Sequence, residues 1–423
     1  MTQRTVVQPP APLTKPALAQ PTAPPVPLVE PTAPVTAAPV PLAAPPAPQP
    51  ASALPAPDPA PPASRRLPKP RADLGLREGY HSAQLPVEVR LNTNESPYPP
   101  PAEWLEAVIA QVRDTAFNRY PDRAAWALRE ALAELHGARP EQVFAANGSN
   151  EVLQSICLAY GGAARVAAMW EPTYALHSHI AHLTGTEVVQ GQRGADFLLD
   201  PVTAVELVEK VRPSIVFLCS PNNPTGLAED RATVTAVLAA APGLVVLDEA
   251  YGQFSSWSAL ELVGDEVPLA VVRTYSKTWS LAGLRLGYMV GPAEVVKVME
   301  RVALPYHLDS MKQAAGRLAL QFSAQMEQRV AAIVDERQRL IAELSRFPVK
   351  VWPSQANFVL WRPLFTRRGQ PVSGAQVWQG LVERSVLVRD TSSWPGLEGC
   401  LRTTVGTPAE NDRFLGALSE VLA

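Results

Sequence analysis

A lysine and an aspartate each follow a hydrophobic run, at positions where their charges could take part in catalysis. Lys277 comes shortly after the predicted strand Ala270–Thr274, just before a turn, and Asp248 directly follows the run 244–247. Open α/β sheets bind ligands at the carboxyl ends of their strands, and a lysine there can form a Schiff base with an aldehyde cofactor. A carboxylate after a buried strand needs a cationic partner, which a protonated pyridine nitrogen would supply. The pair predicts a site that brackets one pyridine ring, although a surface lysine and a structural ion pair are the simpler interpretations.

Polar residues after neighbouring runs could hold other parts of such a cofactor. Asn222 lies in the turn Pro221–Gly226, and it is a candidate donor to a phenolic oxygen on the ring, a role that Tyr251 could share. Donors there would stabilise the phenolate form. Arg285 could reach an anionic group, with Ser276 adding a hydroxyl donor. The turn on its own is only a bend signal, because Asn, Pro and Gly favour turns.

A predicted helix start offers a place for a phosphate. Gly148, Ser149 and Asn150 precede the apolar pattern 152–160, and free N–H groups at a helix start attract anions. Ser and Asn also cap ordinary helices, so the pattern is weak alone. Tyr174 follows another run and could stack on a planar ring, or it could be a core tyrosine.

Three histidines, His177, His179 and His182, occur close together. No carboxylate follows them at the spacing of a metalloenzyme motif. We interpret them as packing or surface residues, and no metal site is predicted.

Elements that would position these side chains are indicated by short β-branched runs that alternate with helical patterns. The predicted strands are Arg165–Met169, Glu187–Gln190, Ile215–Cys219, Leu244–Leu247, Ala270–Thr274 and Tyr288–Gly291, with later strands at Asn357–Trp361, Val386–Arg389 and Leu401–Val405. The predicted helices are Glu103–Arg113, Arg123–His136 and Glu410–Leu422, with a long helical pattern over Met299–Phe347. Alternation of this kind predicts an α/β fold with a mostly parallel sheet covered by helices on both faces. The last part reads as a smaller α+β domain.

Composition narrows the class of protein. The chain has 423 residues, enough for two packed domains, and its net charge of −3 offers no bulk positive field for nucleic acid. No run approaches the roughly 18 apolar residues of a membrane span, and prolines interrupt the N-terminus where a signal peptide would need an apolar core. The three cysteines form no C-x-x-C pair, so we interpret them as reduced thiols of a cytoplasmic protein.

Residues 1–70 differ from the rest, because they hold about half of the 45 prolines. Proline removes backbone donors, so this segment is predicted to be a disordered, extended tail. A misassigned translation start and a docking segment for a proline-reading module are the alternatives. The remaining chain divides, on this prediction, into an N-terminal arm with the start of the small domain (71–120), a large cofactor-binding domain (121–305) and a C-terminal small domain (306–423).

The ordered set of residues resembles fold-type I aminotransferases, and within them the histidinol-phosphate aminotransferases. The resemblance covers roughly residues 73–423. It is carried by Leu91–Tyr98, Asn118–Asp122, Ser220–Gly226, Asp248–Tyr251, Arg273–Tyr288, Asn357–Phe358, Val388–Asp390 and Leu401–Pro408. The family's usual Asn-Glu-Asn-Pro-Tyr-Gly reads Asn94-Glu95-Ser96-Pro97-Tyr98-Pro99 here, and the long tail is atypical.

The resemblance implies further roles. It implies pyridoxal 5'-phosphate as the cofactor, held by Lys277, and a homodimer in which Tyr120 reaches the neighbouring subunit's cofactor phosphate. It also implies substrate-binding residues: Arg402 for an α-carboxylate, Arg389 with Tyr98 of the other subunit for the substrate phosphate, and Asn357 in the same pocket.

The predicted function is amino transfer between histidinol phosphate and 2-oxoglutarate, a step of histidine biosynthesis. The predicted partners are a small-molecule amino donor and a 2-oxo acid, and we expect binding to neither nucleic acid nor a membrane. A broad aromatic aminotransferase would share every cofactor residue. A phosphothreonine decarboxylase of the same fold and a non-catalytic aminotransferase-like regulator are further alternatives. Residues 1–70 contain no helix–turn–helix pattern, which disfavours the regulator.

Overall fold

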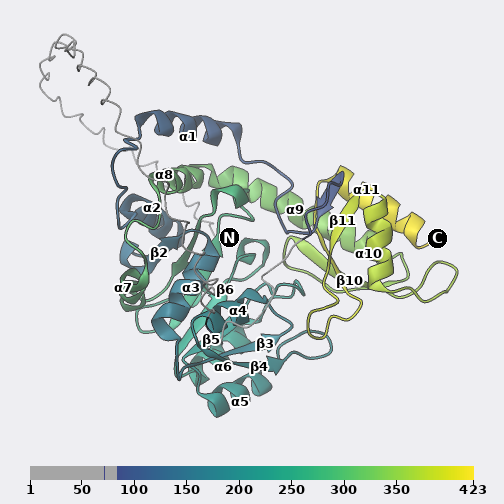
Figure 1. The fold of residues 1–423 in the computed structure, drawn as a ribbon, viewed down its shortest axis with the longest axis horizontal. Helices are drawn as coiled ribbons and strands as arrows, with labels where there is room; N and C mark the ends of the chain where they lie inside the picture. The colour runs from purple at the N-terminus through teal and green to yellow at the C-terminus, as the bar shows by residue number, and fades with distance from the viewer. Residues whose placement is uncertain (1–70, 72–82) are drawn as a thin grey trace, which may run out of the picture. The chain divides into compact units, whose positions relative to one another are not determined.

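The computed structural model describes Arg71 and residues 83–423 (Figure 1). The prediction of a disordered tail over residues 1–70 lies outside the described residues. Two sheets organise the described chain, one of seven strands and one of five.

The larger sheet has the order β2-β8-β7-β6-β5-β3-β4. Its strands are β2 (Val143–Ala146), β3 (Val166–Glu171), β4 (Glu187–Gln192), β5 (Ile215–Cys219), β6 (Leu244–Asp248), β7 (Leu269–Thr274) and β8 (Gly287–Val290). Five neighbouring strands of this sheet, β4, β3, β5, β6 and β7, run parallel to one another, whereas β8 pairs antiparallel with both β7 and β2. The predicted mostly parallel α/β fold is therefore confirmed.

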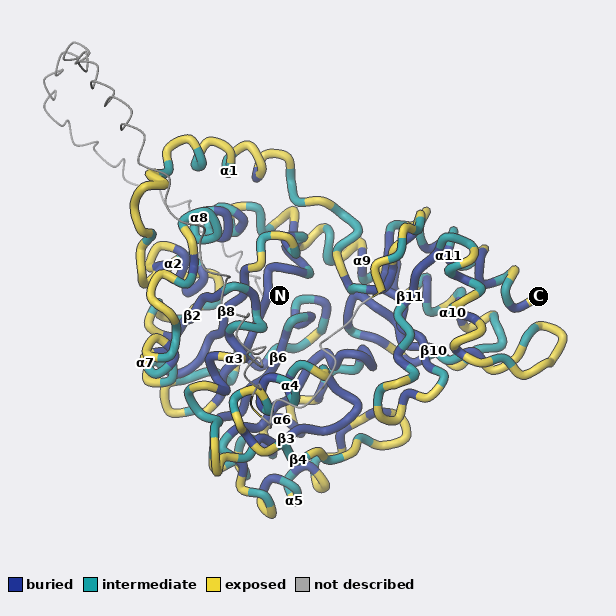
Figure 2. Tube along the Cα trace, viewed as in Figure 1, coloured by how far each residue is buried: buried dark blue, intermediate teal, exposed yellow. Residues whose placement is uncertain are grey.

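Helices cover both faces of the larger sheet, which explains why its central strands are apolar along their whole length. Phe217 and Val246 pack with α3 (Ser149–Tyr160), α4 (Leu176–Leu183) and α7 (Ala293–Val302). Leu218 and Val245 point to the other face and pack with α5 (Pro201–Val211) and α6 (Arg231–Ala240). Figure 2 shows these strands as buried segments between helices with exposed outer surfaces.

Three further helices pack beside β2 and β8. They are α1 (Ala102–Asp114), α2 (Trp126–His136) and α8 (Ser310–Ala319), and their core includes Trp104, Leu132 and Ala315. The helix α2 begins three residues later than predicted, because the Asp122 carboxylate accepts hydrogen bonds from the N–H groups of Ala124 and Trp126 and Ala125 has a left-handed conformation.

The smaller sheet has the order β1-β11-β12-β10-β9. Its strands are β1 (Val89–Leu91), β9 (Val349–Val351), β10 (Phe358–Pro363), β11 (Val386–Asp390) and β12 (Leu401–Thr404). Strand β1 pairs parallel with β11, and the other pairs are antiparallel. One apolar core joins this sheet to α9 (Ser323–Leu344), α10 (Gly374–Glu383) and α11 (Pro408–Val421). The predicted smaller α+β domain is confirmed in its fold.

The long helical pattern predicted over 299–347 is divided into several helices. After α7 ends, Asp309 caps α8, and a 3-10 helix (Leu320–Phe322) joins α8 to α9. Other 3-10 helices are Pro140–Gln142, Gly252–Phe254, Ala259–Leu262 and Ala282–Leu284. None of the helices in the described residues is long and apolar enough to cross a membrane.

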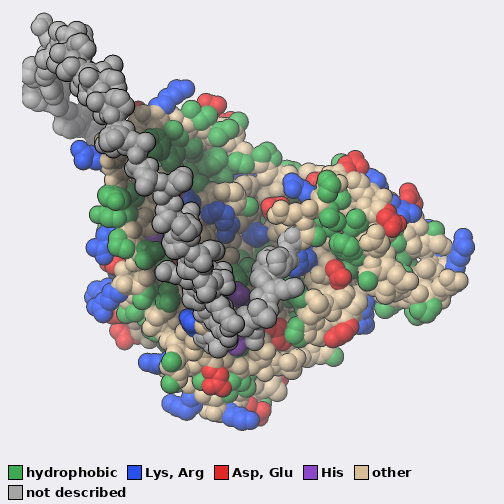
Figure 3. Space-filling view, viewed as in Figure 1, with side chains coloured by type: hydrophobic (Ala, Val, Ile, Leu, Met, Phe, Trp, Pro, Cys, Tyr) green, Lys and Arg blue, Asp and Glu red, His purple; other side chains and the backbone are tan. Residues whose placement is uncertain are grey.

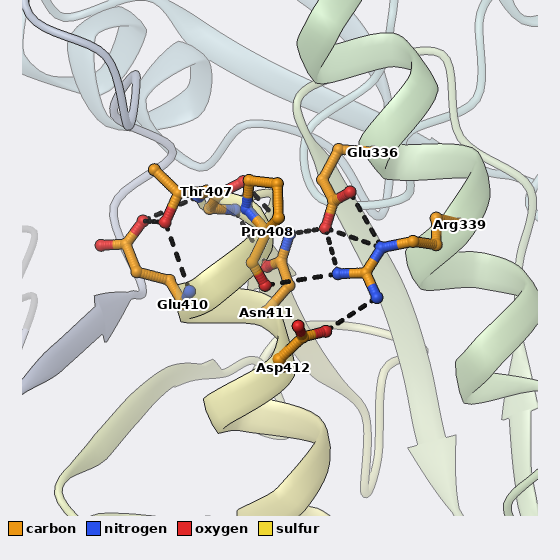
Figure 4. A network of polar contacts seen from close by, with 8 residues as sticks. Glu336, Arg339, Thr407, Pro408, Glu410, Asn411 and Asp412 are labelled. Atoms are coloured by element: carbon orange, nitrogen blue, oxygen red, sulfur yellow. Dashed lines mark hydrogen bonds and ion pairs between the residues drawn. The ribbon is translucent and has the colours of Figure 1, made fainter.

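A polar network fixes α11 against α9 (Figure 4). Glu336 accepts hydrogen bonds from Arg339 and from the buried Asn411, whose Nδ2 lies 2.8 Å from the carboxylate. Arg339 also pairs with Asp412 at 2.7 Å. Thr407 caps α11 reciprocally with Glu410, so the start of this helix is held from both sides.

Candidate active site

A cavity of about 320 Å³ lies at the carboxyl edge of the larger sheet. Residues that follow β3, β5, β6 and β7 line it, together with the start of α3, the N-terminal segment 93–95 and one residue of the smaller sheet. The polar and aromatic side chains of the lining include Glu95, Ser149, Asn150, Tyr174, Asn223, Asp248, Tyr251, Ser276, Lys277, Arg285 and Arg402. On the face drawn in Figure 3, lysine and arginine side chains gather in a hollow near the centre.

Lys277 extends from the end of β7 into this cavity, and its Nζ donates a hydrogen bond to the carbonyl oxygen of Thr93 at 3.1 Å. Burial lowers the pKa of Lys277 from 10.5 to about 7. The positive charge of Arg402 adds to this effect, Glu95 opposes it, and Arg285 lowers the pKa further. An amine with this pKa is partly neutral near pH 7, which a nucleophile or a general base requires.

Asp248, at the end of β6, is buried and hydrogen-bonded. Its Oδ2 lies 3.0 Å from Nε2 of His177, and its Oδ1 accepts from the N–H of Ala250 at 3.0 Å. The His177 ring stacks on Phe217 with ring centroids 4.9 Å apart. Our interpretation of His177 as a packing or surface residue therefore missed a buried polar contact to the predicted catalytic acid.

The turn after β5 places one predicted residue outside the cavity lining. Asn222 is fully buried and does not line the cavity, because its amide bonds Thr173 Oγ1, Thr225 Oγ1 and the Pro172 carbonyl oxygen, each at 3.0 Å. The next residue, Asn223, lines the cavity instead. Asn222 thus fixes the shape of the turn, and Asn223 is the residue that could contact a bound group.

An anion cradle forms where α3 begins. Arg285 Nη1 donates to Ser276 Oγ at 3.3 Å, and a Cβ added to Gly148 would lie 2.9 Å from Arg285 Nη2. The N–H groups of Ser149 and Asn150, at the first positions of α3, have no acceptor within the described residues. Donors of this kind around one space fit a phosphate, since the helix dipole adds to the arginine charge.

The N-terminal segment 93–95 and β12 close the cavity on the side of the smaller sheet. Asn94 Nδ2 donates to the Tyr251 hydroxyl at 2.9 Å. The Arg402 guanidinium, almost completely buried, donates to Asn223 Oδ1 at 2.6 Å and to the Asn92 carbonyl oxygen at 3.0 Å. These contacts connect both sheets at the site.

Besides Asn222 and Gly148, four more predicted site residues lie outside the cavity lining of this chain, namely Tyr120, Tyr98, Arg389 and Asn357. Tyr120 is 80% exposed and stacks on Tyr306 with ring centroids 4.5 Å apart. Tyr98 packs against the core of the smaller sheet, and Arg389 lies opposite Arg402 in the β11–β12 register.

Asn357 lies just behind the cavity, where its Nδ2 donates to the Asn94 carbonyl oxygen at 3.1 Å. Its Oδ1 is buried and has no hydrogen-bond partner among the described residues. Among the residues that the structure describes, no group of three or more His, Cys, Asp or Glu side chains could hold a metal ion.

Comparison with known proteins gives the family. Residues 86–418 match the family described as Aminotransferase class I and II. The chain belongs to this family. Over 358 residues it is 44% identical to a histidinol-phosphate aminotransferase of Frankia casuarinae, which covers 81% of this chain and 87% of the relative. It is also 44% identical over 355 residues to the enzyme of that name from Thermobifida fusca, covering 82% of this chain and 94% of the relative.

Solved structures agree on the fold of this aminotransferase. The histidinol-phosphate aminotransferase of Sinorhizobium meliloti, solved in complex with pyridoxal-5'-phosphate, superposes with a TM-score of 0.70. The two share 23% sequence identity, over 79% of this chain and 91% of the other. The resemblance to aminotransferases stated from the sequence is thus confirmed at the level of family and fold.

Proposed function

We propose that this aminotransferase uses pyridoxal 5'-phosphate to move an amino group between histidinol phosphate and 2-oxoglutarate, as a step of histidine biosynthesis. Its identity of 44% to relatives with the corresponding name supports the substrate. The observation that carries the chemistry is that the Lys277 amine and the Asp248 carboxylate line one cavity of about 320 Å³.

The residues of the cavity fit this cofactor. The N–H groups of Ser149 and Asn150, with Ser276 and Arg285, would hold the phosphate. The group itself supplies an electron sink for the negative charge that develops on the substrate carbon.

The ring would be held by three kinds of contact. Asp248, oriented by its hydrogen bond with His177, would pair with the protonated ring nitrogen. Asn223 and Tyr251 would donate to the phenolic oxygen, which assigns to Asn223 the role first predicted for Asn222. Tyr174, which also lines the cavity, would cover the ring face.

Lys277 would carry the proton. With a pKa of about 7, its Nζ can take a proton from the carbon that bears the substrate amino group and later return it. The Thr93 carbonyl oxygen, 3.1 Å from Nζ, holds the amine at the side of the cavity that faces the N-terminal segment.

Arginines on the smaller sheet would bind the substrates. Arg402 would grip the carboxylate of the 2-oxo acid, because its planar fork matches two oxygens. Arg389 and Tyr98 would serve the substrate phosphate, with Asn357 in the same region. The unpartnered Oδ1 of Asn357 supports a contact to a bound molecule or to water.

A homodimer and a cytoplasmic location complete the proposal. The exposure of Tyr120, at 80%, suits a side chain that contacts another subunit, and Tyr98 would act from that subunit as well. The three cysteines are buried free thiols, which suits a reducing compartment. The domain boundaries given from the sequence also stay a prediction.

The chemistry is tested by Lys277→Ala. This variant should lose amino transfer and the absorbance of the lysine-bound cofactor, because no other amine lies in the lining. Lys297→Ala, which changes a lysine that is 62% exposed, is the control and should keep both. Amino transfer by Lys277→Ala at the rate of the unchanged protein would contradict the proposal.

The substrate is tested separately by comparing kcat/KM for histidinol phosphate and for phenylalanine. We expect a preference for histidinol phosphate. A preference for phenylalanine would refute the substrate and leave the aminotransferase chemistry in place.

A further inference from the structure

A second cavity, of about 230 Å³, lies between the two sheets and away from the active-site lining. We name it the junction pocket. Its walls from the larger-sheet side are Pro172, Gln192, Arg193, Gly194, Ala195 and Phe197, and those from the smaller-sheet side are Lys350, Trp352, Arg362 and Gly396. None of its residues takes part in the function proposed above.

Two positive charges face each other in this pocket. Lys350 on β9 lies directly opposite Arg362 on β10 in the antiparallel register. Like charges directly opposite one another destabilise a strand pair. Among the described residues, neither side chain forms a hydrogen bond or an ion pair with an acid. The sequence thus keeps an unfavourable pair that a bound anion would neutralise.

The indole of Trp352 forms the apolar floor between these charges. The Lys350 Nζ lies 4.5 Å and the Arg362 Cζ 6.0 Å from the centre of the ring. Phe197 packs on the same indole with ring centroids 5.2 Å apart, so a loop on the larger-sheet side stabilises the position of the Trp352 ring. Both cations are therefore held toward one space by cation–π contacts.

Arg193, on the opposite wall, adds a third cationic group, a guanidinium that is buried and paired with Glu229 at 2.5 Å. Its Nε has no hydrogen-bond partner within the described residues. Because Glu229 neutralises Arg193, and because no acidic side chain lines the pocket, the pocket carries two uncompensated positive charges. Besides burial, the negative charge of Glu398 raises the pKa of the nearby Cys400 thiol, but Glu398 does not line the pocket.

We propose that the junction pocket binds a small phosphate dianion, either inorganic phosphate or the phosphate of a small monoester. Two charges on the ligand match the two free charges of Lys350 and Arg362, and an arginine fork suits phosphate oxygens. The volume is below that of sites for drug-sized ligands, which limits the ligand to a small molecule. This inference does not depend on the proposed enzymatic function.

The test titrates the cofactor-loaded protein with inorganic phosphate while chloride is withdrawn to keep ionic strength constant. The readout is the indole N–H resonance of Trp352, assigned with Trp352→Phe. We expect a saturable shift, and an affinity lower by about tenfold or more in Arg362→Gln and in Lys350→Gln. Lys297→Gln is the matched control, because it removes one exposed lysine elsewhere, and it should titrate like the unchanged protein.

Three results would overturn the proposal. They are a Trp352 resonance that does not saturate, a shift of equal midpoint in the Arg362→Gln and Lys350→Gln variants, and a tighter response to succinate than to phosphate. If a variant fails to fold, the titration of the unchanged protein with phosphate and with succinate still decides the matter.

Discussion

The pKa of Lys277 gives a prediction about how fast the protein without cofactor captures pyridoxal phosphate. Capture needs the neutral amine. With a pKa of about 7, half of the Lys277 amines are neutral at that pH. An ordinary lysine with a pKa near 10.4 has roughly one neutral amine in three thousand. The fraction of amine competent for capture at neutral pH should therefore exceed that of a solvent-exposed lysine by on the order of a thousandfold, and the rate of capture should be higher, by at most this factor.

The charges around the Lys277 amine determine whether a substitution raises or lowers the pH midpoint of cofactor capture. Arg402 lowers the pKa of Lys277 and Glu95 raises it. Glu95→Gln should therefore move the midpoint of capture to lower pH, and Arg402→Gln should move it to higher pH. Glu88→Gln, which changes an exposed carboxylate outside the cavity, is the control and should leave the midpoint unchanged.

The assay is stopped-flow absorbance after pyridoxal phosphate is added to the cofactor-free protein, between about pH 5.5 and pH 10. The rate should rise with pH and level off above the midpoint, since a group of lowered pKa loses its proton early. A midpoint near pH 10 in the unchanged protein would refute the role assigned to burial. A shift of both variants in the same direction would refute the role assigned to the two charges.

Two other variants test contacts around the site. His177→Phe keeps an aromatic ring but removes the hydrogen bond to Asp248. The kcat should therefore fall by about 10- to 100-fold, which is the contribution of a hydrogen bond to a charged group. Steady-state kinetics across pH would measure this fall, and an unchanged kcat would contradict the prediction. In Gly287→Ala the new Cβ would lie 2.2 Å from the backbone nitrogen of Ser149, so the start of α3 must move and cofactor retention in equilibrium dialysis should drop by about tenfold or more. Gly416→Ala, with open space around the added Cβ, is its control and should retain cofactor normally.

Much of the larger sheet could be predicted, because its central strands are buried on both faces and therefore read as uninterrupted apolar runs. The predicted Ile215–Cys219 coincides with β5, and Leu244–Leu247 differs from β6 by one residue. Strands β1 and β9 have only three residues each, and β2 is the short segment Val-Phe-Ala-Ala. Such short segments carry too little periodicity to stand out, since tertiary pairing and not local preference makes them strands.

The site was predictable where a polar residue lies at the end of a central strand or a few residues after it. Lys277 and Asp248 are of this kind, because the carboxyl ends of neighbouring parallel strands meet at one edge. The turn after β5 was not predictable in detail, because Asn222 and Asn223 are chemically identical neighbours and only the folded turn decides which one lines the cavity. The contact of His177 was missed for a similar reason, since it depends on how α4 is rotated against β5 and β6.

Strand β1 has a consequence for how this chain matures during synthesis. Val89 pairs with Val386, and the N–H of Asn94 bonds to Thr404 Oγ1 across 310 residues of sequence. The ribosome makes the segment that contacts Lys277 before Lys277 itself, whereas the strands to which this segment is attached are made after Lys277. Early-made domains can fold while synthesis continues, but a contact of this span cannot form until both ends exist. The active site of the nascent chain therefore stays open on this side until Val386 and Thr404 have been made.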